Sequence, residues 1–306
     1  MLTIEHLSAM YGAHAVLTGV SFDARPGEIV GVIGPNGAGK SSLLRVISGT
    51  LAPAQGRVLL NGIDLSRASA AARARQVAVV PQSSYLPDAF TVGEVVLMGR
   101  TPHLPLLGVE GPHDYEVVRA ALERTATSSL AERRIGELSG GEQQRVLIAR
   151  ALAQIAGVAR STSSGQACSV DAATGSARSL AQSSGPGAGS RALLLDEATA
   201  HLDLKHQNAI WELVRQLARE GLIVIAALHD LNIAALYADR LALLSGGRLL
   251  TCGQPAQVLT PEWLRRAYDV TAAVVAHPLY GTPLVALAAG RMPGVVESVD
   301  KGMERE

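Results

Sequence analysis

The sequence has few cysteines, few aromatic residues and no net charge, and each shortage argues against a class of protein. Its 306 residues include two cysteines, Cys168 and Cys252, too few for a disulfide framework and without the spacing of a metal site. The 27 basic residues balance the 27 acidic ones, so the overall basic charge typical of nucleic-acid-binding proteins is absent. We therefore expect free thiols and no nucleic-acid partner.

Long apolar runs are also missing. Mean hydropathy is +0.21, but no uninterrupted apolar stretch approaches the roughly 18–20 residues needed to cross a bilayer. The opening MLTIEHLSAM lacks the basic start and apolar centre of a signal peptide, so we expect the chain to stay in the cytosol. With 48% hydrophobic residues the chain is apolar enough to bury a large core, which argues against disorder.

Short apolar segments and longer helical patterns alternate along the chain. LTIEHL, GVSFDARPGE and IVGVIG, within residues 2–34, predict strands, the last one buried on both faces. Residues 91–152 are mainly helical, and strands alternate with helices again from ALLLDE onward. This order predicts an α/β protein with a strand-rich start, a parallel-sheet core and a helical insertion inside that core. Further on, AAVVAHPLYGTPLVAL predicts two short strands around a turn.

The stretch GPNGAGKS, residues 34–41, lies between a buried strand and a helix. Both the pattern and this context are typical of a phosphate-binding loop. Its glycines allow backbone N–H groups to face phosphate oxygens, and the helix N-terminus adds a favourable dipole. Lys40 is expected to reach the β- and γ-phosphates, and the Ser41 hydroxyl to bind Mg²⁺. The alternative is a glycine-rich turn that holds no ligand.

Two carboxylates, Asp196 and Glu197, end the buried strand ALLLDE. Ligands of open α/β sheets bind at the C-terminal ends of the strands. An Asp at that edge can hold Mg²⁺ through water, and a neighbouring Glu can orient and deprotonate an attacking water. On its own the pair could equally cap a helix, but beside a phosphate loop it favours a hydrolytic site.

The stretch LSGGEQQRVLIARAL, residues 138–152, places a serine and two glycines directly before a long helix. Alone it predicts a helix N-cap, with an anion cradle as the alternative. Together with the phosphate loop and the two carboxylates, it resembles the signature sequence of ATP-binding cassette ATPases. Other marks of that family stand in the family's order, and the resemblance covers roughly residues 1–270. These marks are Tyr11, Gln82 in VVPQSS, AHLD at 200–203 and His229 in ALHDLN.

This resemblance implies a P-loop (RecA-like) parallel-sheet core with an N-terminal antiparallel β region and an inserted α-helical subdomain. Such a protein would bind ATP and Mg²⁺ and hydrolyse ATP to ADP and phosphate. Tyr11 would stack on adenine, and the triphosphate would lie on Gly34, Pro35, Asn36, Gly37, Ala38, Gly39, Lys40, Ser41 and Ser42. The catalytic residues would be Glu197, His229 and Gln82. The residues that bind Mg²⁺ would be Ser41, Gln82 and Asp196. From the residues alone, Tyr11 could be a half-buried strand residue, Gln82 a plain loop residue and His229 a core histidine.

The resemblance also implies a head-to-tail dimer in which each chain supplies half of each ATP site. The signature residues Ser139, Gly140, Gly141 and Glu142 would close on ATP bound to the second ATPase subunit, expected to be another copy of this chain. Asp203 would communicate across the dimer. ATP binding would close the dimer and hydrolysis would reopen it.

Two further segments, 91–106 and 229–259, are similar to ATPase subunits of bacterial importers for ferric siderophores, haem and cobalamin. Gly99, Arg100, Pro102 and His103 are the most suggestive residues, although they could be general features of helical subdomains. The similarity implies integral membrane permease subunits bound near Gln82 and residues 91–130, a solute-binding protein beyond them, and a place on the cytoplasmic face of the membrane. A non-transport cassette ATPase of DNA repair, translation or cluster assembly is an alternative, as is a scaffold without catalysis.

The resemblance sets domain limits as well. The ATPase domain would comprise a core of 1–84 and 191–270 and a helical subdomain of 85–154, followed by a tail of 271–306. Ala198 departs from the family, which usually has proline there, and we expect hydrolysis to survive this change.

Residues 156–190 interrupt the match between the signature and Asp196 with a stretch rich in Ser, Gly and Ala. Such a composition cannot bury enough surface to offset its ordering entropy, so we expect a mobile insertion. It precedes the strand ALLLDE, at the end opposite Asp196 and Glu197. A regulatory or partner-binding role is the alternative.

Overall fold

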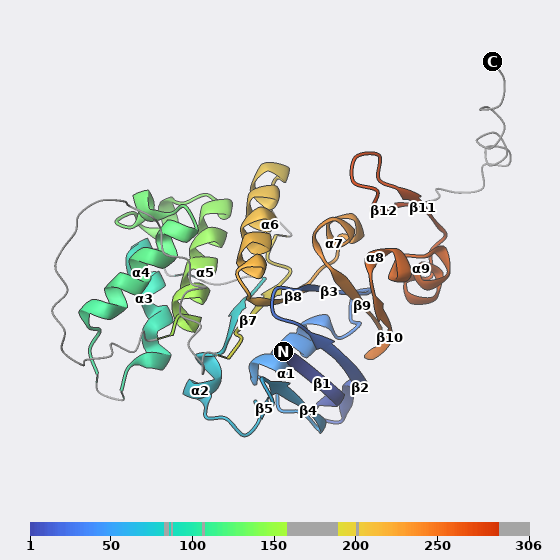
Figure 1. Ribbon diagram of the computed structural model, residues 1–306, viewed down its shortest axis with the longest axis horizontal. Helices are drawn as coiled ribbons and strands as arrows, with labels where there is room; N and C mark the ends of the chain where they lie inside the picture. Colours follow the sequence, from blue (N-terminus) through green and yellow to red (C-terminus); the bar gives the residue numbers. More distant parts are fainter. Residues whose placement is uncertain (83–85, 87, 106–107, 158–188, 200–201, 288–306) are drawn as a thin grey trace, which may run out of the picture.

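A six-stranded sheet forms the centre of the molecule (Figure 1). The computed structural model describes residues 1–82, 86, 88–105, 108–157, 189–199 and 202–287. The strand order is β10-β9-β3-β8-β7-β6, and all neighbours are parallel except the β9/β10 pair. The strands are β3 (Ile29–Ile33), β6 (Val77–Val80), β7 (Ala192–Asp196), β8 (Ile223–Ala227), β9 (Arg240–Ser245) and β10 (Arg248–Gly253). The predicted parallel core is therefore confirmed.

Helices and a second sheet cover the two faces of this sheet. In β3, Ile29 and Ile33 face one hydrophobic core while Val30 and Val32 face the other, as the twofold alternation of a strand requires. The first core includes α6 (Leu204–Arg219) and α7 (Leu231–Tyr237). The second includes α1 (Lys40–Ser48), which lies below the sheet in Figure 1. Burial on both faces explains why β3 reads as a continuous apolar run.

The second sheet is antiparallel, with the order β2-β1-β4-β5. It is made of β1 (Leu2–Tyr11), β2 (His14–Ala24), β4 (Gln55–Leu60) and β5 (Ile63–Asp64). Buried side chains alternate with more exposed ones at the start of β1, where Leu2 and Ile4 are almost fully buried. This sheet confirms the predicted antiparallel region at the N-terminus.

The segment from Thr91 to Ile155 is helical and lies at the left of Figure 1, apart from the antiparallel sheet. Its elements are α3 (Val92–Leu97), η1 (Met98–His103), α4 (Pro112–Arg124), η2 (Ser128–Leu130), η3 (Ile135–Glu137) and α5 (Gly140–Ile155), preceded by α2 (Ala70–Ala74). The predicted helical region is confirmed, whereas its limits at 85 and 154 stay a prediction. No helix among the described residues combines the length and apolarity needed to span a membrane.

Arg100 fixes the end of α5. Its side chain is fully buried, its Nε donates to Asp114 Oδ1 at 2.9 Å, and its Nη1 donates to the carbonyls of Ala153 (2.7 Å) and Ala156 (3.0 Å). The His103 ring adds a 2.7 Å hydrogen bond to the Gln154 carbonyl. Because cations and donors satisfy the free carbonyls of a helix C-terminus, this end of α5 is held in place where the serine- and glycine-rich insertion begins.

The last described residues form two short helices and a β-hairpin. After α8 (Pro255–Val258) and α9 (Pro261–Tyr268), β11 (Ala272–Ala276) and β12 (Pro283–Leu287) form an antiparallel hairpin. The two short strands predicted there are confirmed. The expected mobility of 156–190 concerns residues that lie mostly outside the described ones, as do the end of the predicted tail and Cys168.

Candidate functional site

Four neighbouring parallel strands bring the predicted site residues to one edge of the sheet. Gly34 follows β3, His229 stands two residues after β8, Asp196 ends β7, and Gln82 stands two residues after β6. Since these strands are adjacent in the order β3-β8-β7-β6, their C-terminal ends lie side by side. Residues almost two hundred positions apart in the sequence thus meet at one edge.

The phosphate loop has the backbone geometry that its glycines predict. Gly34 (φ +150°) and Gly39 (φ +101°) adopt backbone conformations that are unfavourable for residues with a side chain. In addition, a Cβ on Gly39 would lie 2.8 Å from the Val16 carbonyl oxygen. Helix α1 starts at Lys40, and no described side chain caps its N-terminus. Its first N–H groups are therefore free to bind an anion.

The side chain of Lys40, the first residue of α1, contacts the start of this loop and is almost completely buried. Its Nζ donates to the carbonyl of Gly34 at 2.9 Å and to that of Pro35 at 3.3 Å, and lies 3.8 Å from Glu197 Oε1. Burial lowers the pKa of Lys40, while Glu197 and Asp196 act in the opposite direction. The Lys40 ammonium is therefore desolvated and bonded mainly to neutral carbonyls. A phosphate group bound in the loop would accept a stronger, charge-assisted hydrogen bond from it.

Ser41 and Asp196 form the second contact of the site, because the Ser41 hydroxyl donates to Asp196 Oδ1 at 2.8 Å. Burial raises the pKa of Asp196; the Ser41 hydrogen bond opposes the shift and the charge of Glu197 adds to it. A hydroxyl and a carboxylate oxygen in contact are the hard ligands that Mg²⁺ prefers. The described residues contain no group of three or more His, Cys, Asp or Glu side chains arranged around a metal position. Such a site therefore fits an ion that takes its other ligands from phosphates and water.

Glu197 lies between Lys40 and Gln82. The Gln82 amide donates to Glu197 Oε2 at 3.0 Å, and the Glu197 backbone N–H donates to the Ala227 carbonyl at 3.1 Å. Its backbone is left-handed, with φ of +48°, a conformation that costs a non-glycine residue about 1–3 kcal/mol and concentrates at functional sites. The turn that directs this carboxylate toward the loop is thus a strained one.

Tyr11 ends β1 next to α1, with 43% of its surface exposed. Its hydroxyl accepts a hydrogen bond from Arg45 Nη1 at 3.0 Å. We did not predict a role for Arg45 from the sequence. The available signal was its position four residues after Ser41, on the same face of α1.

Strand β2 joins the Tyr11 side of the site to the phosphate loop. The Thr18 N–H donates to the Gly247 carbonyl at 2.8 Å, and the Gly247 N–H donates to the Ala38 carbonyl at 3.2 Å. A side chain at Gly247 would collide with the Val16 backbone, so a close approach requires glycine here. We did not predict a role for Gly247 from the sequence, although the Gly-Gly pair in LLSGGRLL indicates a turn.

His229 lies at the same edge with an exposed side chain, and its neighbour Asp230 caps α7 by accepting from the N–H groups of Asn232 and Ile233. Between described residues, the structure gives the His229 ring no hydrogen bond. It is therefore positioned by β8 and faces solvent.

The signature residues form a helix cap away from the phosphate loop. Ser139 and Glu142 make a capping box at the start of α5, and the N–H and hydroxyl of Ser139 lower the pKa of Glu142. No hydrogen bond or ion pair between described residues joins them to residues 34–42. Instead, Gly140 and Gly141 pack against Leu202 and His206 of the same chain, beside the cap of α6 made by Asp203.

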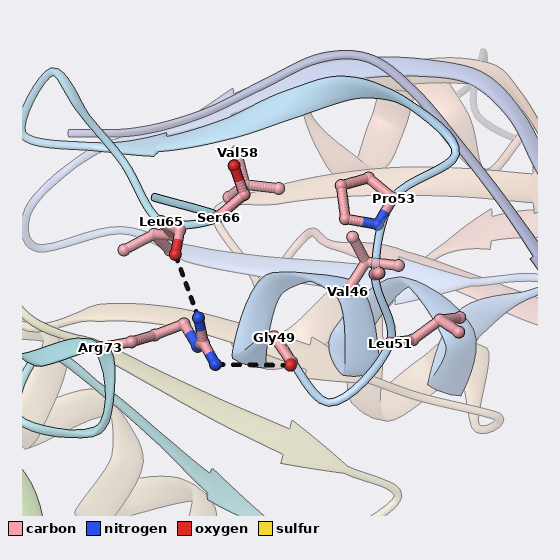
Figure 2. A pocket seen from close by; sticks show the side chains of 9 residues that line it. Val46, Gly49, Leu51, Pro53, Val58, Leu65, Ser66 and Arg73 are labelled. Atoms are coloured by element: carbon pink, nitrogen blue, oxygen red, sulfur yellow. Dashed lines mark hydrogen bonds between the residues drawn. The ribbon is translucent and has the colours of Figure 1, made fainter. Parts of the chain in front are cut away.

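A separate cavity of about 110 Å³ lies at the other end of α1 (Figure 2). Arg73 crosses it and donates to the carbonyls of Ser48, Gly49, Leu65 and Ala68. The guanidinium satisfies carbonyls at the C-terminus of α1 and is not free to bind a ligand. We therefore do not assign this cavity to the candidate functional site.

Comparison with known proteins shows the family. Residues 17–159 match the model of the family described as ABC transporter. The hemin import ATP-binding protein HmuV of Gloeobacter violaceus is 43% identical over 285 residues, which cover 93% of each chain. The chain belongs to the ABC transporter family. As an ABC ATP-binding subunit it binds ATP, and its ATPase activity is coupled to transport.

Other relatives cover the same length of this ABC subunit. HmuV of Pseudomonas aeruginosa is 43% identical, with 93% of this chain and 99% of the relative covered. The cobalamin import ATP-binding protein BtuD of Halobacterium salinarum is 40% identical over 93% of this chain and 63% of BtuD. Among solved structures, a metal-chelate type ABC transporter in an inward-facing conformation superposes with a TM-score of 0.72 at 26% identity, covering 94% of this chain and 97% of that one. The predicted ABC ATPase fold is therefore confirmed.

Proposed function

We propose that the strand edge binds ATP with its triphosphate on residues 34–42 and its adenine on Tyr11. The uncapped start of α1, the buried Lys40 and the exposed Tyr11 ring support this arrangement. Ser41, Asp196 and Gln82 would hold Mg²⁺, which when bound neutralises phosphate charge. Ser41 and Asp196 are in contact, and Gln82 reaches the same site through Glu197.

Glu197 is the proposed general base. Its carboxylate is fixed by Gln82 and by the charge of Lys40, so it can orient a water molecule and accept its proton. His229, exposed at the end of β8, would contact the γ-phosphate, and Gln82 would link this state to the permease. Ala198, the residue after Glu197, is buried, and the Asp196 and Glu197 carboxylates keep their contacts to Ser41 and Gln82.

The signature residues Ser139, Gly140, Gly141 and Glu142 would act on ATP bound to a second copy of the chain. Among the described residues, no hydrogen bond or ion pair joins them to the phosphate loop of their own chain, which supports an action in trans. Asp203 is exposed at the start of α6, where it can face a partner. Closure of the dimer would then depend on the γ-phosphate, and hydrolysis would release it.

The transported solute is proposed to be a metal chelate, with haem first and cobalamin or a ferric siderophore as alternatives. The observation that carries this proposal is the 41–43% identity to hemin import ATP-binding proteins across 93% of the chain. Import ATP-binding relatives work with membrane permease components, which supports a position of this chain at the cytoplasmic face of the membrane, with a solute-binding protein on the far side as a further proposed partner. This argues against an ATPase of DNA repair, translation or cluster assembly.

Reconstitution in proteoliposomes tests the proposal. The chain, its permease and its solute-binding protein should hydrolyse ATP faster with hemin-loaded binding protein than with cobalamin or a ferric siderophore. A Glu197→Gln complex serves as the control without turnover. Stimulation by another chelate would contradict haem, and failure to co-purify with any membrane protein would contradict the importer.

A further inference from the structure

Gly141 lacks room for a side chain because His206 occupies the space. A Cβ built on Gly141 would overlap three atoms of His206, with the Cβ of His206 at 3.0 Å and its ring atoms nearer still. Gly141 lies inside α5 and does not have a positive φ. Backbone freedom therefore does not explain the glycine, but close packing against the ring does.

The other side of the His206 ring is tied to Asp203. Nδ1 of His206 lies 2.8 Å from Asp203 Oδ1, and the same oxygen accepts the backbone N–H of His206 at 2.8 Å. The bond to the N–H caps α6, so Asp203 fixes both the helix start and the ring. The ring consequently bridges the first turn of α6 and the first turn of α5.

The segment before α6 continues this connection to the catalytic carboxylate. Thr199, two residues after Glu197, is buried, and its carbonyl accepts from the Leu202 N–H (3.3 Å) and from Gln207 Nε2 (3.0 Å). Leu202 in turn lies 3.6 Å from the Cβ position of Gly140. A short series of contacts thus joins Glu197, Asp203 and the signature turn of one chain.

We propose that His206 is a positioning residue that sets the signature turn of α5 relative to Asp203 and Glu197. Gly141 is then a glycine because of the His206 ring in its own chain. The proposal rests on the proposed role of the signature in trans. Since a signature turn serves the second ATP site while Glu197 serves the first, His206 would couple the geometry of the two sites.

A compensating pair of substitutions tests the idea. Gly141→Ala alone should push α5 away from the ring, and displacements near 1 Å can cost about 10²-fold in rate. We expect kcat for ATP to fall at least about tenfold with little change in KM, because the chain's own phosphate loop is untouched. Adding His206→Ala removes the obstacle, so the double variant should regain kcat relative to Gly141→Ala, up to the level of His206→Ala alone.

Different failures have different meanings. If the double variant is no more active than Gly141→Ala, the glycine is needed for another reason, such as room for the partner's nucleotide, and the proposal is overturned. If Gly141→Ala lowers the thermal midpoint but leaves kcat unchanged, the signature role in the proposed function fails instead. The fraction of each variant that forms an ATP-bound dimer would also be measured. A purely structural role of His206 would leave this fraction unchanged.

Single substitutions at His206 separate the ring from its polar bond. His206→Phe keeps a ring against Gly141 and should retain more activity than His206→Ala. Equal losses in the two variants would show that ring packing does not position the turn. His277→Ala, in the turn between β11 and β12, is the matched control and should behave like the unaltered chain.

Discussion

Arg45 on α1 donates a hydrogen bond of 3.0 Å to the Tyr11 hydroxyl at the end of β1. Arg45 lies on a helix and Tyr11 on a strand of the antiparallel sheet, so the bond fixes the ring relative to the helix that follows the phosphate loop. Loss of one such bond costs about 0.5–1.5 kcal/mol, which corresponds to roughly a two- to tenfold change in affinity. Arg45→Met and Tyr11→Phe should each raise KM for ATP by this factor without lowering kcat.

Tyr11→Ala removes the ring as well and should raise KM further, since stacking a base contributes about 1–3 kcal/mol. Inhibition by tripolyphosphate, which has no base, is the control and should be the same in all three variants. An unchanged KM in Tyr11→Ala would remove Tyr11 from the nucleotide site.

Glu197→Gln should retain ATP binding, abolish turnover and trap an ATP-bound dimer. Gln keeps the shape of the side chain but cannot accept a proton, and general bases contribute about 10²–10⁴-fold to rates. Phosphate release and gel filtration with ATP measure the two effects. Glu123→Gln, exposed on α4, should leave both unchanged, and normal turnover in Glu197→Gln would refute the base assignment.

Ser139→Ala should lower the free energy of unfolding by about 1 kcal/mol at pH 7, the usual cost of losing a helix cap. Ser139 lowers the pKa of Glu142, so this stabilisation is present above the ordinary Glu pKa of about 4.3 and is lost as pH falls through the lower folded value. Urea unfolding from pH 7 down to about pH 3 should show the difference between the two proteins shrinking. A difference that grows toward acid pH would contradict this, and Ser128→Ala is the control.

Arg100→Met should destabilise the chain by about 3–5 kcal/mol, because it leaves Asp114 and the carbonyls of Ala153 and Ala156 without their donor. Arg100→Lys should recover part of this loss, since an ammonium keeps the charge but not the fork of donors. The urea midpoint measures both. Arg119→Met, at an exposed position on α4, is the control, and an equally small loss in Arg100→Met would contradict a role for Arg100 in holding α5.

Replacing residues 157–190 with a four-residue link should leave ATP hydrolysis near normal. Gly157 lies against the guanidinium of Arg191, so the two ends approach within the reach of an arginine side chain, and four residues can span up to about 13 Å. Both ends lie at the C-terminal end of α5, and the signature lies at its start. A collapse of activity with an unchanged thermal midpoint would instead show that the insertion acts in regulation.

Local patterns made much of the fold predictable. The apolar runs of β3 and β7, the glycines of residues 34–39 and the turn between β11 and β12 are each encoded within a few neighbouring residues. The site then follows, because parallel strands end at one edge. For the same reason, Asp196 and Glu197 could be placed near Lys40 from the sequence, whereas Gln82 was assigned to the site only through the family resemblance.

Contacts between distant segments could not be predicted in this way. Arg45 meets Tyr11 across 34 positions, and Gly247 meets Ala38 from the far end of the chain. His206 against Gly141 depends on how two helices pack, which hydrophobic periodicity does not specify. The left-handed backbone of Glu197 arises from the same tertiary constraint, since nothing in LLLDEATA requires it.

The bonds from Thr18 through Gly247 to Ala38 have one more consequence. They join the antiparallel sheet that carries Tyr11 to the phosphate loop, so the two halves of the proposed ATP site are already connected in the folded chain. The entropy of bringing these halves together is thus lost on folding and not on binding. An isolated subunit should therefore accept ATP with little rearrangement of its own, which leaves the free energy of the γ-phosphate contacts to draw two subunits together.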